Sequence, residues 1–294
     1  MHICFITSEY PMSGFPHGGI GAFVKTISQK LVDLGHKVSV LGINTYTEKD
    51  IVENDQNVTI YRLKPRKVKG LTWWFNNQLL NQKLAAFHNE NTIDIVETAE
   101  LGLAFLRKNK SIRYIIRLHG GHHFFAEAEQ RKISFWRGFQ EKRSFKKADA
   151  FIAVSNFVKT HTEKYLSYNN KPLREIKSPI NLDIFIPKPD IIIEPFSILF
   201  AGTVCEKKGV SHLINAMPKV LDQYPGANLY IYGRDWFFKN GRSNIDYLEE
   251  EVLPGLKELH KNVHFMGAVP MTELVDKYAS AEVCIFPSLM ETQG

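Results

Sequence analysis

The sequence predicts an α/β protein built from two Rossmann-like, doubly wound domains. Short apolar strands alternate with segments of helical period along the chain, and one proline-rich stretch interrupts the alternation. This alternation is typical of parallel sheets that are covered by helices on both faces. With 294 residues, the chain is long enough for each of two domains to bury its own core.

The first series of elements extends from the N-terminus to residue 154. We expect strands at 2–7, 37–43, 57–63, 94–97, 113–118 and 150–154, and helices at 20–34, 71–89 and 135–147. The helical segments repeat apolar residues every three or four positions, as Phe23, Ile27 and Leu31 do in the first of them. Gly35 follows that segment, where glycine favours a helix end.

The proline-rich stretch marks the domain boundary. Pro187, Pro189 and Pro195 lie within nine residues, and proline disfavours both helix interiors and central strands. We therefore predict domains at 1–185 and 186–294. The second series has expected strands at 197–201, 228–232, 263–265 and 283–286, with helices between them. Two such domains predict a ligand cleft between them, outside the carboxyl ends of the strands.

Composition limits the class of partner and the compartment. The net charge of +6 is a mild basic excess, which suits an anionic ligand or a membrane surface but is too small and dispersed to argue for nucleic acid, so we expect no nucleic-acid partner. Three widely separated cysteines fit a reduced, cytosolic protein better than a disulfide framework. We find neither a signal peptide nor a transmembrane stretch, so we expect a cytoplasmic protein, with the inner face of the membrane as its alternative location.

The stretch FSILFAGTVCEKKG, residues 196–209, predicts a phosphate site. A strand ends at the glycine turn of Gly202, and Lys208 and Gly209 precede a segment of helical period. The amide groups and dipole of a helix N-terminus, together with a cation, favour a bound phosphate. The ordinary alternative for Lys-Lys-Gly is a solvated turn.

A second glycine loop, with Gly18 and Gly19, precedes the first predicted helix. Glycine allows a backbone to approach a phosphate or a sugar closely, although a flexible turn is the ordinary alternative. The loop is not a dinucleotide fingerprint, because Val24 stands where that fingerprint has its third glycine.

Two further candidates follow predicted strands. His119 ends the strand RYIIRL and is therefore expected to face the ligand crevice. His122 and His123 lie close to it in sequence, but no carboxylate or thiol completes a metal-binding set, so no metal is predicted. Glu291 lies in a polar loop after the last strand, where an acid would point into the same crevice as Lys208.

Six motifs in this order resemble the retaining glycosyltransferases of family 4, which have the GT-B architecture. The motifs are HGGIGAFVKTISQKLVDLGHKVSVL, His119-Gly120, ADAFIAVS, SPINLDIFIP, ILFAGTVCEKKG and NVHFMGAVPMTELVDKYASAEVCIFPSLMET. The resemblance implies that His119 and Glu291 are the catalytic residues. It also implies a set of residues that bind the donor diphosphate: Gly18, Gly19, Gly202, Thr203 and Lys208.

The sequence departs from the family pattern in two places. The family usually has arginine directly after the glycine of the phosphate loop, where this chain has Thr203; Lys207 or Arg234 are candidate replacements. The family's second glutamate would stand eight positions after Glu291, beyond the last residue. We therefore expect a second domain that is cut short.

The implied activity is transfer of a sugar from a nucleoside-diphosphate donor to a glycan or lipid-linked acceptor, with retention at the anomeric carbon. The expected context is synthesis of a cell-surface polysaccharide or glycolipid, without a metal or other cofactor. A sugar-nucleotide epimerase and a non-catalytic donor-binding fragment are the alternatives. The segments LTWWFNNQLL and ISFWRGFQEKRSFKK also suggest peripheral membrane contact, with ordinary sheet-packed helices as the alternative.

Overall fold

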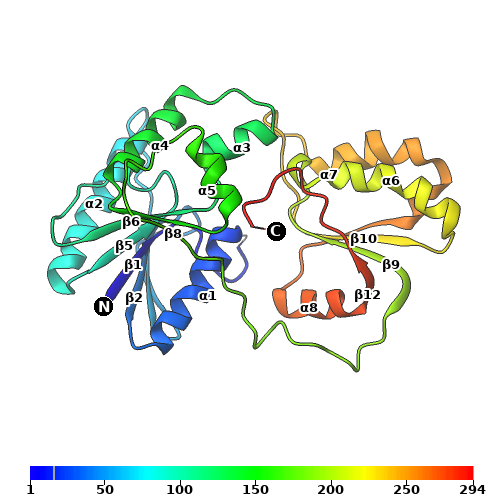
Figure 1. The fold of residues 1–294 in the computed structure, drawn as a ribbon, viewed down its shortest axis with the longest axis horizontal. Helices are drawn as coiled ribbons and strands as arrows, with labels where there is room; N and C mark the ends of the chain where they lie inside the picture. Colours follow the sequence, from blue (N-terminus) through cyan, green and yellow to red (C-terminus); the bar gives the residue numbers. More distant parts are fainter. Residues whose placement is uncertain (16, 294) are drawn as a thin grey trace. The chain divides into compact units, whose positions relative to one another are not determined.

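Two sheets, one in each of two units of the chain, organise the protein (Figure 1). The computed structural model describes residues 1–15 and 17–293, without the side chains of residues 128, 257 and 259. Unit 1 comprises Met1–Ile180 and the terminal residues from Thr292 on, and unit 2 comprises Asn181–Glu291. The division after Ile180 lies five residues before the predicted boundary at 185. The predicted end of the second domain, Gly294, lies outside the described residues.

Unit 1 contains an eight-stranded sheet in the order β3-β4-β2-β1-β5-β6-β7-β8. Only β3 is antiparallel to its neighbour among these strands of the described chain. The strands are β1 His2–Ile6, β2 Lys37–Ile43, β3 Ile51–Asp55, β4 Val58–Leu63, β5 Ile95–Thr98, β6 Arg113–Leu118, β7 Ala150–Ala153 and β8 Leu173–Glu175. The helices are α1 Gly19–Asp33, α2 Thr72–Glu90, α3 His122–Ala128, α4 Phe135–Lys147 and α5 Asn156–Glu163.

Unit 2 contains a four-stranded parallel sheet in the order β11-β10-β9-β12. Its strands are β9 Glu194–Ala201, β10 Asn228–Tyr232, β11 Val263–Gly267 and β12 Ala281–Cys284. Its helices are α6 Val210–Gln223, α7 Asn244–Tyr247 and α8 Met271–Ser280, with helical turns at Glu206–Lys208, Leu248–Val252 and Leu253–Asn262. Phe200, Ile214 and Leu229 belong to the core between this sheet and its helices, which stabilises the central strand β9.

The structure confirms the predicted α/β class and corrects some predicted bounds. The segments 113–118, 135–147 and 228–232 form the expected elements. The strand expected at 57–63 begins one residue later, because Gln56 and Asn57 both have positive φ and form the turn that joins β3 to β4. The strand expected at 283–286 is β12, which begins and ends two residues earlier.

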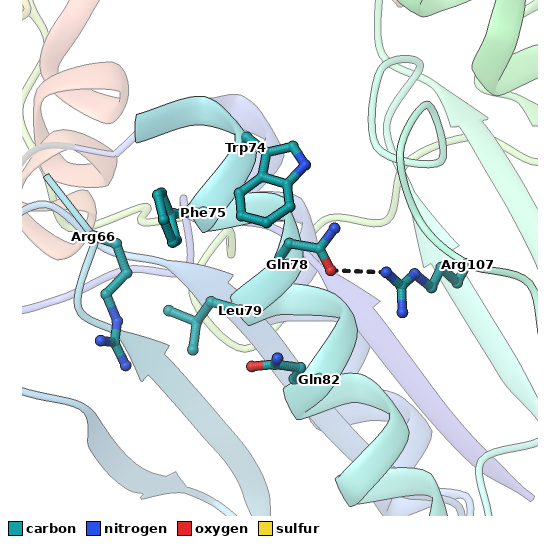
Figure 2. A pocket seen from close by; sticks show the side chains of 7 residues that line it. All are labelled: Arg66, Trp74, Phe75, Gln78, Leu79, Gln82 and Arg107. Atoms are coloured by element: carbon teal, nitrogen blue, oxygen red, sulfur yellow. Dashed lines mark hydrogen bonds between the residues drawn. The ribbon is translucent and has the colours of Figure 1, made fainter. Parts of the chain in front are cut away.

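Helix α2 borders a surface pocket of about 480 Å³ (Figure 2). Trp74, Phe75 and Leu79 extend from the helix, and Arg66 and Arg107 approach from opposite sides of it. The Arg107 guanidinium donates to the Gln78 amide oxygen at 2.9 Å. The pocket therefore combines an aromatic lining with two guanidinium groups. Among the residues that the structure describes, no helix is long and apolar enough to span a bilayer.

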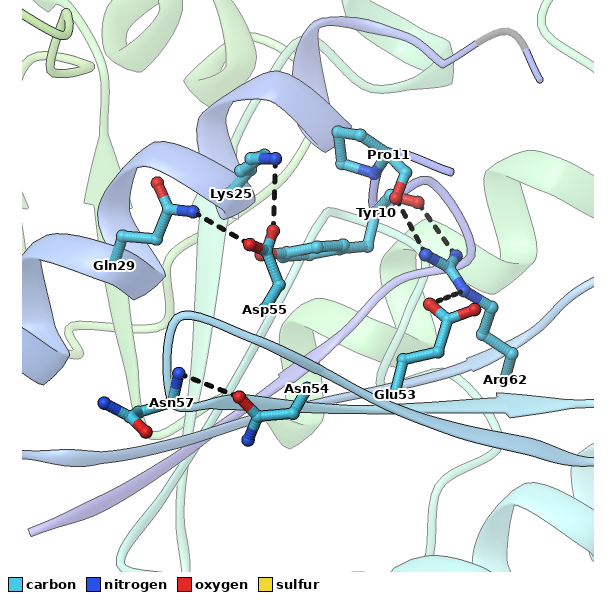
Figure 3. Close-up of polar contacts among 9 residues, drawn as sticks. All are labelled: Tyr10, Pro11, Lys25, Gln29, Glu53, Asn54, Asp55, Asn57 and Arg62. Atoms are coloured by element: carbon cyan, nitrogen blue, oxygen red, sulfur yellow. Dashed lines mark hydrogen bonds and ion pairs between the residues drawn. The ribbon is translucent and has the colours of Figure 1, made fainter. Parts of the chain in front are cut away.

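A buried arginine fixes the loop that leads into α1 (Figure 3). Arg62 on β4 donates to the backbone carbonyls of Tyr10 and Pro11 at 2.9 and 2.8 Å, and its Nε donates to Glu53 at 2.8 Å. The Arg62 side chain is only 4% exposed, so removing it would leave these acceptors without their charged donor. The hairpin of β3 and β4 also holds α1, through Asp55 at the end of β3. The Asp55 carboxylate accepts from Tyr10 Oη and Gln29 and pairs with Lys25.

We expect Arg62→Met to lower the free energy of unfolding by about 3 kcal/mol, because the variant leaves one carboxylate and two carbonyls without their donor. Urea unfolding at neutral pH measures this change. Arg113→Met, at the exposed start of β6, is the matched control and should stay within about 0.5 kcal/mol of wild type. Equal effects of the two substitutions would contradict the role given to Arg62.

Candidate active site

The candidate site in unit 2 is made by three loops at one edge of the sheet. Residues 202–209 follow β9, residues 233–235 follow β10 and residues 285–291 follow β12. The three strands are adjacent and parallel, so their carboxyl ends meet at the same edge. This is where the sequence predicted a ligand.

Two glycines allow these loops to pack backbone against backbone. A Cβ atom on Gly233 would lie 1.7 Å from the carbonyl oxygen of Gly202. Gly209 has a left-handed φ of 72°, and a Cβ there would lie 2.0 Å from the carbonyl oxygen of Pro287. Both positions therefore require glycine, because any side chain would push the neighbouring loop away.

The packing at Gly209 brings two predicted site residues together. The Lys208 ammonium forms an ion pair with the Glu291 carboxylate, although the residues are 83 positions apart. The backbone N–H of Leu289 donates to the carbonyl oxygen of Lys207 at 2.9 Å and holds the same two loops. The side chains of Lys208 and Glu291 are 28% and 36% exposed, so both remain accessible to a ligand.

The start of α6 offers backbone donors beside this ion pair. Gly209 is its N-cap, and no side chain caps the helix there. The positive end of the helix dipole therefore adds to the charge of the preceding lysines. Such an arrangement favours an anionic group, as the sequence predicted for residues 196–209.

Thr203 and Arg234 occupy neighbouring loops. The backbone N–H of Val204 donates to the carbonyl oxygen of Arg234 at 2.9 Å, which places Arg234 next to the loop that contains Thr203. The Arg234 guanidinium lies over the Trp236 ring, 5.2 Å from its centroid. A cation is thus present in the loop beside the position where the family pattern has arginine.

In unit 1, the glycine loop begins helix α1. Gly18 is its N-cap without a side-chain cap. A Cβ on Gly18 would lie 2.4 Å from Glu9 Oε2, and one on Gly21 would lie 1.9 Å from the Glu9 carbonyl oxygen. A Cβ on Gly19 would meet nothing within 4 Å. The loop therefore leaves open space only at Gly19, while the Glu9 carboxylate lies beside Gly18 and disfavours an anion there.

His119 follows β6 and packs against α1. The centroids of the His119 and Phe23 rings are 5.0 Å apart, and the Arg117 guanidinium lies 4.6 Å from the centroid of the Phe23 ring. Burial lowers the pKa of His119 to about 3, and the positive charge of Arg117 acts in the same direction. The imidazole is therefore neutral at physiological pH and can form hydrogen bonds with hydroxyl groups.

Two buried carboxyl groups, which the sequence analysis missed, support the loop after His119. Glu141 on α4 is fully buried and accepts hydrogen bonds from the backbone N–H groups of His122 and His123 and from the His123 ring. Glu100, just after β5, is 4% exposed, packs against Gly121 of the same loop, and has no hydrogen-bond partner for its Oε1 among the described residues. The position of Glu100, three residues after the strand predicted at 94–97, was the signal that could have found it.

These carboxyl groups also explain the glycines of the loop. A Cβ on Gly121 would lie 2.2 Å from Glu141 Oε1 and 3.0 Å from Glu100 Cγ. Gly120 has a left-handed φ of 87°, and a Cβ there would lie 2.5 Å from the Phe125 ring. Among the described residues, no three His, Cys, Asp or Glu side chains are grouped as a metal site requires.

Comparison with known proteins gives two family models that match most of the chain. The model described as Glycosyltransferase Family 4 matches residues 17–184, and the one described as Glycosyl transferases group 1 matches residues 195–294. An uncharacterized glycosyltransferase of Methanocaldococcus jannaschii is 27% identical over 321 residues, which cover 100% of this chain and 76% of the relative.

Two further proteins resemble the chain more distantly. The gpi3 subunit of the phosphatidylinositol N-acetylglucosaminyltransferase of Schizosaccharomyces pombe is 24% identical over 300 residues, covering 95% of this chain and 60% of that protein. The solved structure of sucrose-phosphate synthase from Thermosynechococcus elongatus has a TM-score of 0.79 at 21% identity, and the match covers 100% of this chain and 77% of that one. At this identity, the likeness is evidence of the fold.

The burial of Glu100 makes stability depend on pH. Burial raises its pKa to about 8, and the nearby Glu141 acts in the same direction, whereas glutamate in an unfolded chain has a pKa of about 4.3. At pH values between these two pKa values, Glu100 holds a proton in the folded protein that it releases in the unfolded chain. The contribution of Glu100 to stability is therefore complete at low pH and falls as the pH rises toward 8.

We expect Glu100→Gln, which is neutral at every pH, to gain stability relative to wild type between pH 5 and pH 8, by on the order of 3 kcal/mol. Urea unfolding at several pH values measures the difference. Glu163→Gln, on the exposed side of α5, is the control, and its difference from wild type should stay constant. A constant difference for Glu100→Gln as well would show that Glu100 is ionised in the folded protein.

Proposed function

We propose a donor and a reaction course for this chain, which belongs to glycosyltransferase family 4 and has the GT-B fold. It moves a sugar from a nucleoside diphosphate to an acceptor, with retention of configuration at the anomeric carbon. The observation that carries the proposal is the anion site in unit 2. There, Lys208 lies at an uncapped helix start, directly against the loop that carries Glu291.

The chemistry of the leaving group supports this assignment. When the bond between the sugar and the diphosphate breaks, negative charge develops on the diphosphate oxygens. We assign the stabilisation of that charge to the Lys208 ammonium and the N–H groups at the start of α6, with Thr203 and Gly202 in the preceding turn. We assign Arg234 the role that arginine has at position 203 in the family pattern, with Lys207 as the second candidate cation. No metal or other cofactor is needed in this proposal.

Glu291 has two successive partners in the proposed reaction. Without a donor, its carboxylate pairs with Lys208. A bound diphosphate competes for the lysine and leaves the carboxylate available to accept hydrogen bonds from hydroxyl groups of the donor sugar. We assign His119, as a neutral imidazole, to a further hydroxyl of that sugar. We assign the Gly19 amide to the diphosphate in preference to Gly18, because the loop is open at Gly19 and the Glu9 carboxylate lies beside Gly18.

The acceptor is proposed to be a glycan or a lipid-linked acceptor, in cell-surface polysaccharide or glycolipid synthesis in the cytoplasm, with the inner face of the membrane as the alternative location. The name of the Schizosaccharomyces pombe relative includes phosphatidylinositol, which favours a lipid acceptor. A panel of UDP-, GDP- and ADP-sugars, incubated with the protein and a membrane extract, tests the proposal. We expect one of them to release its nucleoside diphosphate only when the extract is present.

The same assay separates the alternatives. NMR of the product's anomeric proton distinguishes retention from inversion. Conversion of one nucleotide sugar into another without an acceptor would indicate an epimerase. Absence of binding to every nucleoside diphosphate in calorimetry would contradict the proposal and favour a non-catalytic protein.

We expect Lys208→Ala to weaken nucleoside-diphosphate binding by about 10- to 100-fold, because it removes a charge-assisted hydrogen bond. Isothermal titration calorimetry with UDP and GDP measures the change. Lys219→Ala is a control of the same charge on the exposed face of α6, and it should bind like wild type. Wild-type affinity in Lys208→Ala would exclude the lysine from the diphosphate site.

We expect Glu291→Gln to bind the free nucleoside diphosphate a few-fold more tightly while sugar transfer slows by about 100-fold or more. The substitution removes the carboxylate that competes for Lys208, but it also removes the acceptor of the sugar's hydrogen bonds. Calorimetry and the transfer assay on the same preparation measure the two effects. Weaker binding of the diphosphate would show that Glu291 does not compete with it.

A further inference from the structure

An exposed group of aromatic side chains covers one part of unit 1. It comprises Trp73 and Trp74 at the start of α2 and Phe135, Trp136 and Phe139 at the start of α4, and we call these five residues the tryptophan face. Their exposed fractions range from 42% to 88%. Three of the chain's four tryptophans belong to this face. Aromatic surface of this kind is costly to expose to water and marks an interaction site.

Ring contacts hold three of the five residues of the tryptophan face in one arrangement. The Trp73 ring lies edge-on to Phe105 at 4.4 Å and to Trp136 at 5.5 Å. Trp136 is also stacked on Phe105 at 5.9 Å and on Phe139 at 5.8 Å. These three side chains therefore lose little conformational freedom when a partner covers them.

The pocket on α2 continues this surface. Trp74 belongs both to the tryptophan face and to the pocket lining, and Arg66 and Arg107 approach the pocket from opposite sides of the helix (Figure 2). Guanidinium groups beside aromatic rings suit an amphiphilic anion, which has an acidic head and an apolar body.

The charge around the face is strongly one-sided. The three segments that build it, residues 64–87, 101–113 and 131–147, contain sixteen of the chain's 37 Lys and Arg but only one of its 31 Asp and Glu. That single acid, Glu141, is fully buried and bonded to the loop after His119. The exposed charge of these segments is therefore entirely positive.

Several of these cations have no acidic partner among the residues that the structure describes. Lys67, Lys69 and Arg137 are exposed and pair with no carboxylate in that part of the chain. Four others pair with carboxylates of neighbouring segments, namely Lys64, Lys83, Lys108 and Arg131. Like charges on both copies would oppose self-association through this face. An anionic surface with an apolar interior can pair with the cations and also remove the aromatic rings from water.

We propose that the tryptophan face docks unit 1 onto a bilayer that contains anionic phospholipid. The rings enter the interface between headgroups and acyl chains, and the surrounding Lys and Arg attract the lipid phosphates. The partner is the membrane surface itself, and the contact does not depend on which sugar the protein transfers.

Vesicle binding tests the proposal in the Trp236→Phe background, where the tryptophan face contains all the remaining tryptophans. We expect the emission to shift to the blue with vesicles that contain about one third phosphatidylglycerol, but not with phosphatidylcholine alone. Co-sedimentation should agree, and about 0.5 M NaCl should release the protein because salt screens the attraction. No shift and no co-sedimentation at low salt would overturn the proposal.

Charge reversal locates the contact. Combining Lys67→Glu, Lys69→Glu and Arg137→Glu should weaken vesicle binding on the order of a hundredfold, since each cation near an anionic bilayer contributes about a factor of five. The control combines Lys219→Glu, Lys239→Glu and Lys261→Glu, which are exposed in unit 2 and change the net charge equally. Equal binding by the two triple variants would overturn the assignment to this face.

Phe135→Ser provides a variant that is safe for folding, because the Phe135 side chain is 88% exposed. It should weaken vesicle binding several-fold and leave the unfolding midpoint unchanged. Light scattering without lipid tests whether a second copy of the chain, instead of a membrane, covers the tryptophan face. A dimer that Phe135→Ser dissociates would show that a second copy of the chain covers the face, and that the membrane proposal is wrong.

Discussion

The backbone contact at Gly209 is the constraint on which the candidate donor site depends. Gly209 has a left-handed conformation, and the Pro287 carbonyl occupies the space that a Cβ would need. The loop after β12 can therefore lie directly on the start of α6, within reach of Lys208. The ion pair between Lys208 and Glu291 follows from this packing. One glycine thus connects the helix dipole, the cation and the acid that the proposed chemistry uses.

Unit 1 relies on buried polar groups to shape its glycine-rich loops. Arg62 holds the loop that leads into α1, and Glu141 holds the loop after β6. In both cases a charged group is buried where backbone donors or acceptors satisfy it. Ordinary hydrophobic packing would not determine the path of these glycine-rich loops. The proposed membrane contact belongs to another part of the same unit, where cations and rings remain exposed.

The sequence predicted those parts of the fold that local patterns determine. The strands 113–118 and 228–232 and the helix 135–147 were confirmed, since apolar period and length are properties of the segment itself. The short edge strands β3 and β8 were missed because they bury little and have weak patterns. Lys208 and Glu291 were each predicted, but their pairing depends on a contact between positions 83 residues apart. The burial of Glu100 likewise depends on what tertiary packing places over it.

Hydrogen–deuterium exchange with and without a nucleoside diphosphate tests the central claim most directly, because it needs neither the donor sugar nor the acceptor. The account predicts slower exchange in three segments of unit 2: residues 202–212, 233–235 and 287–291. These segments contain the start of α6 and the loops that pack against it. Slower exchange confined to other parts of the chain, or no change at saturating nucleotide, would contradict the assignment of the diphosphate to this site.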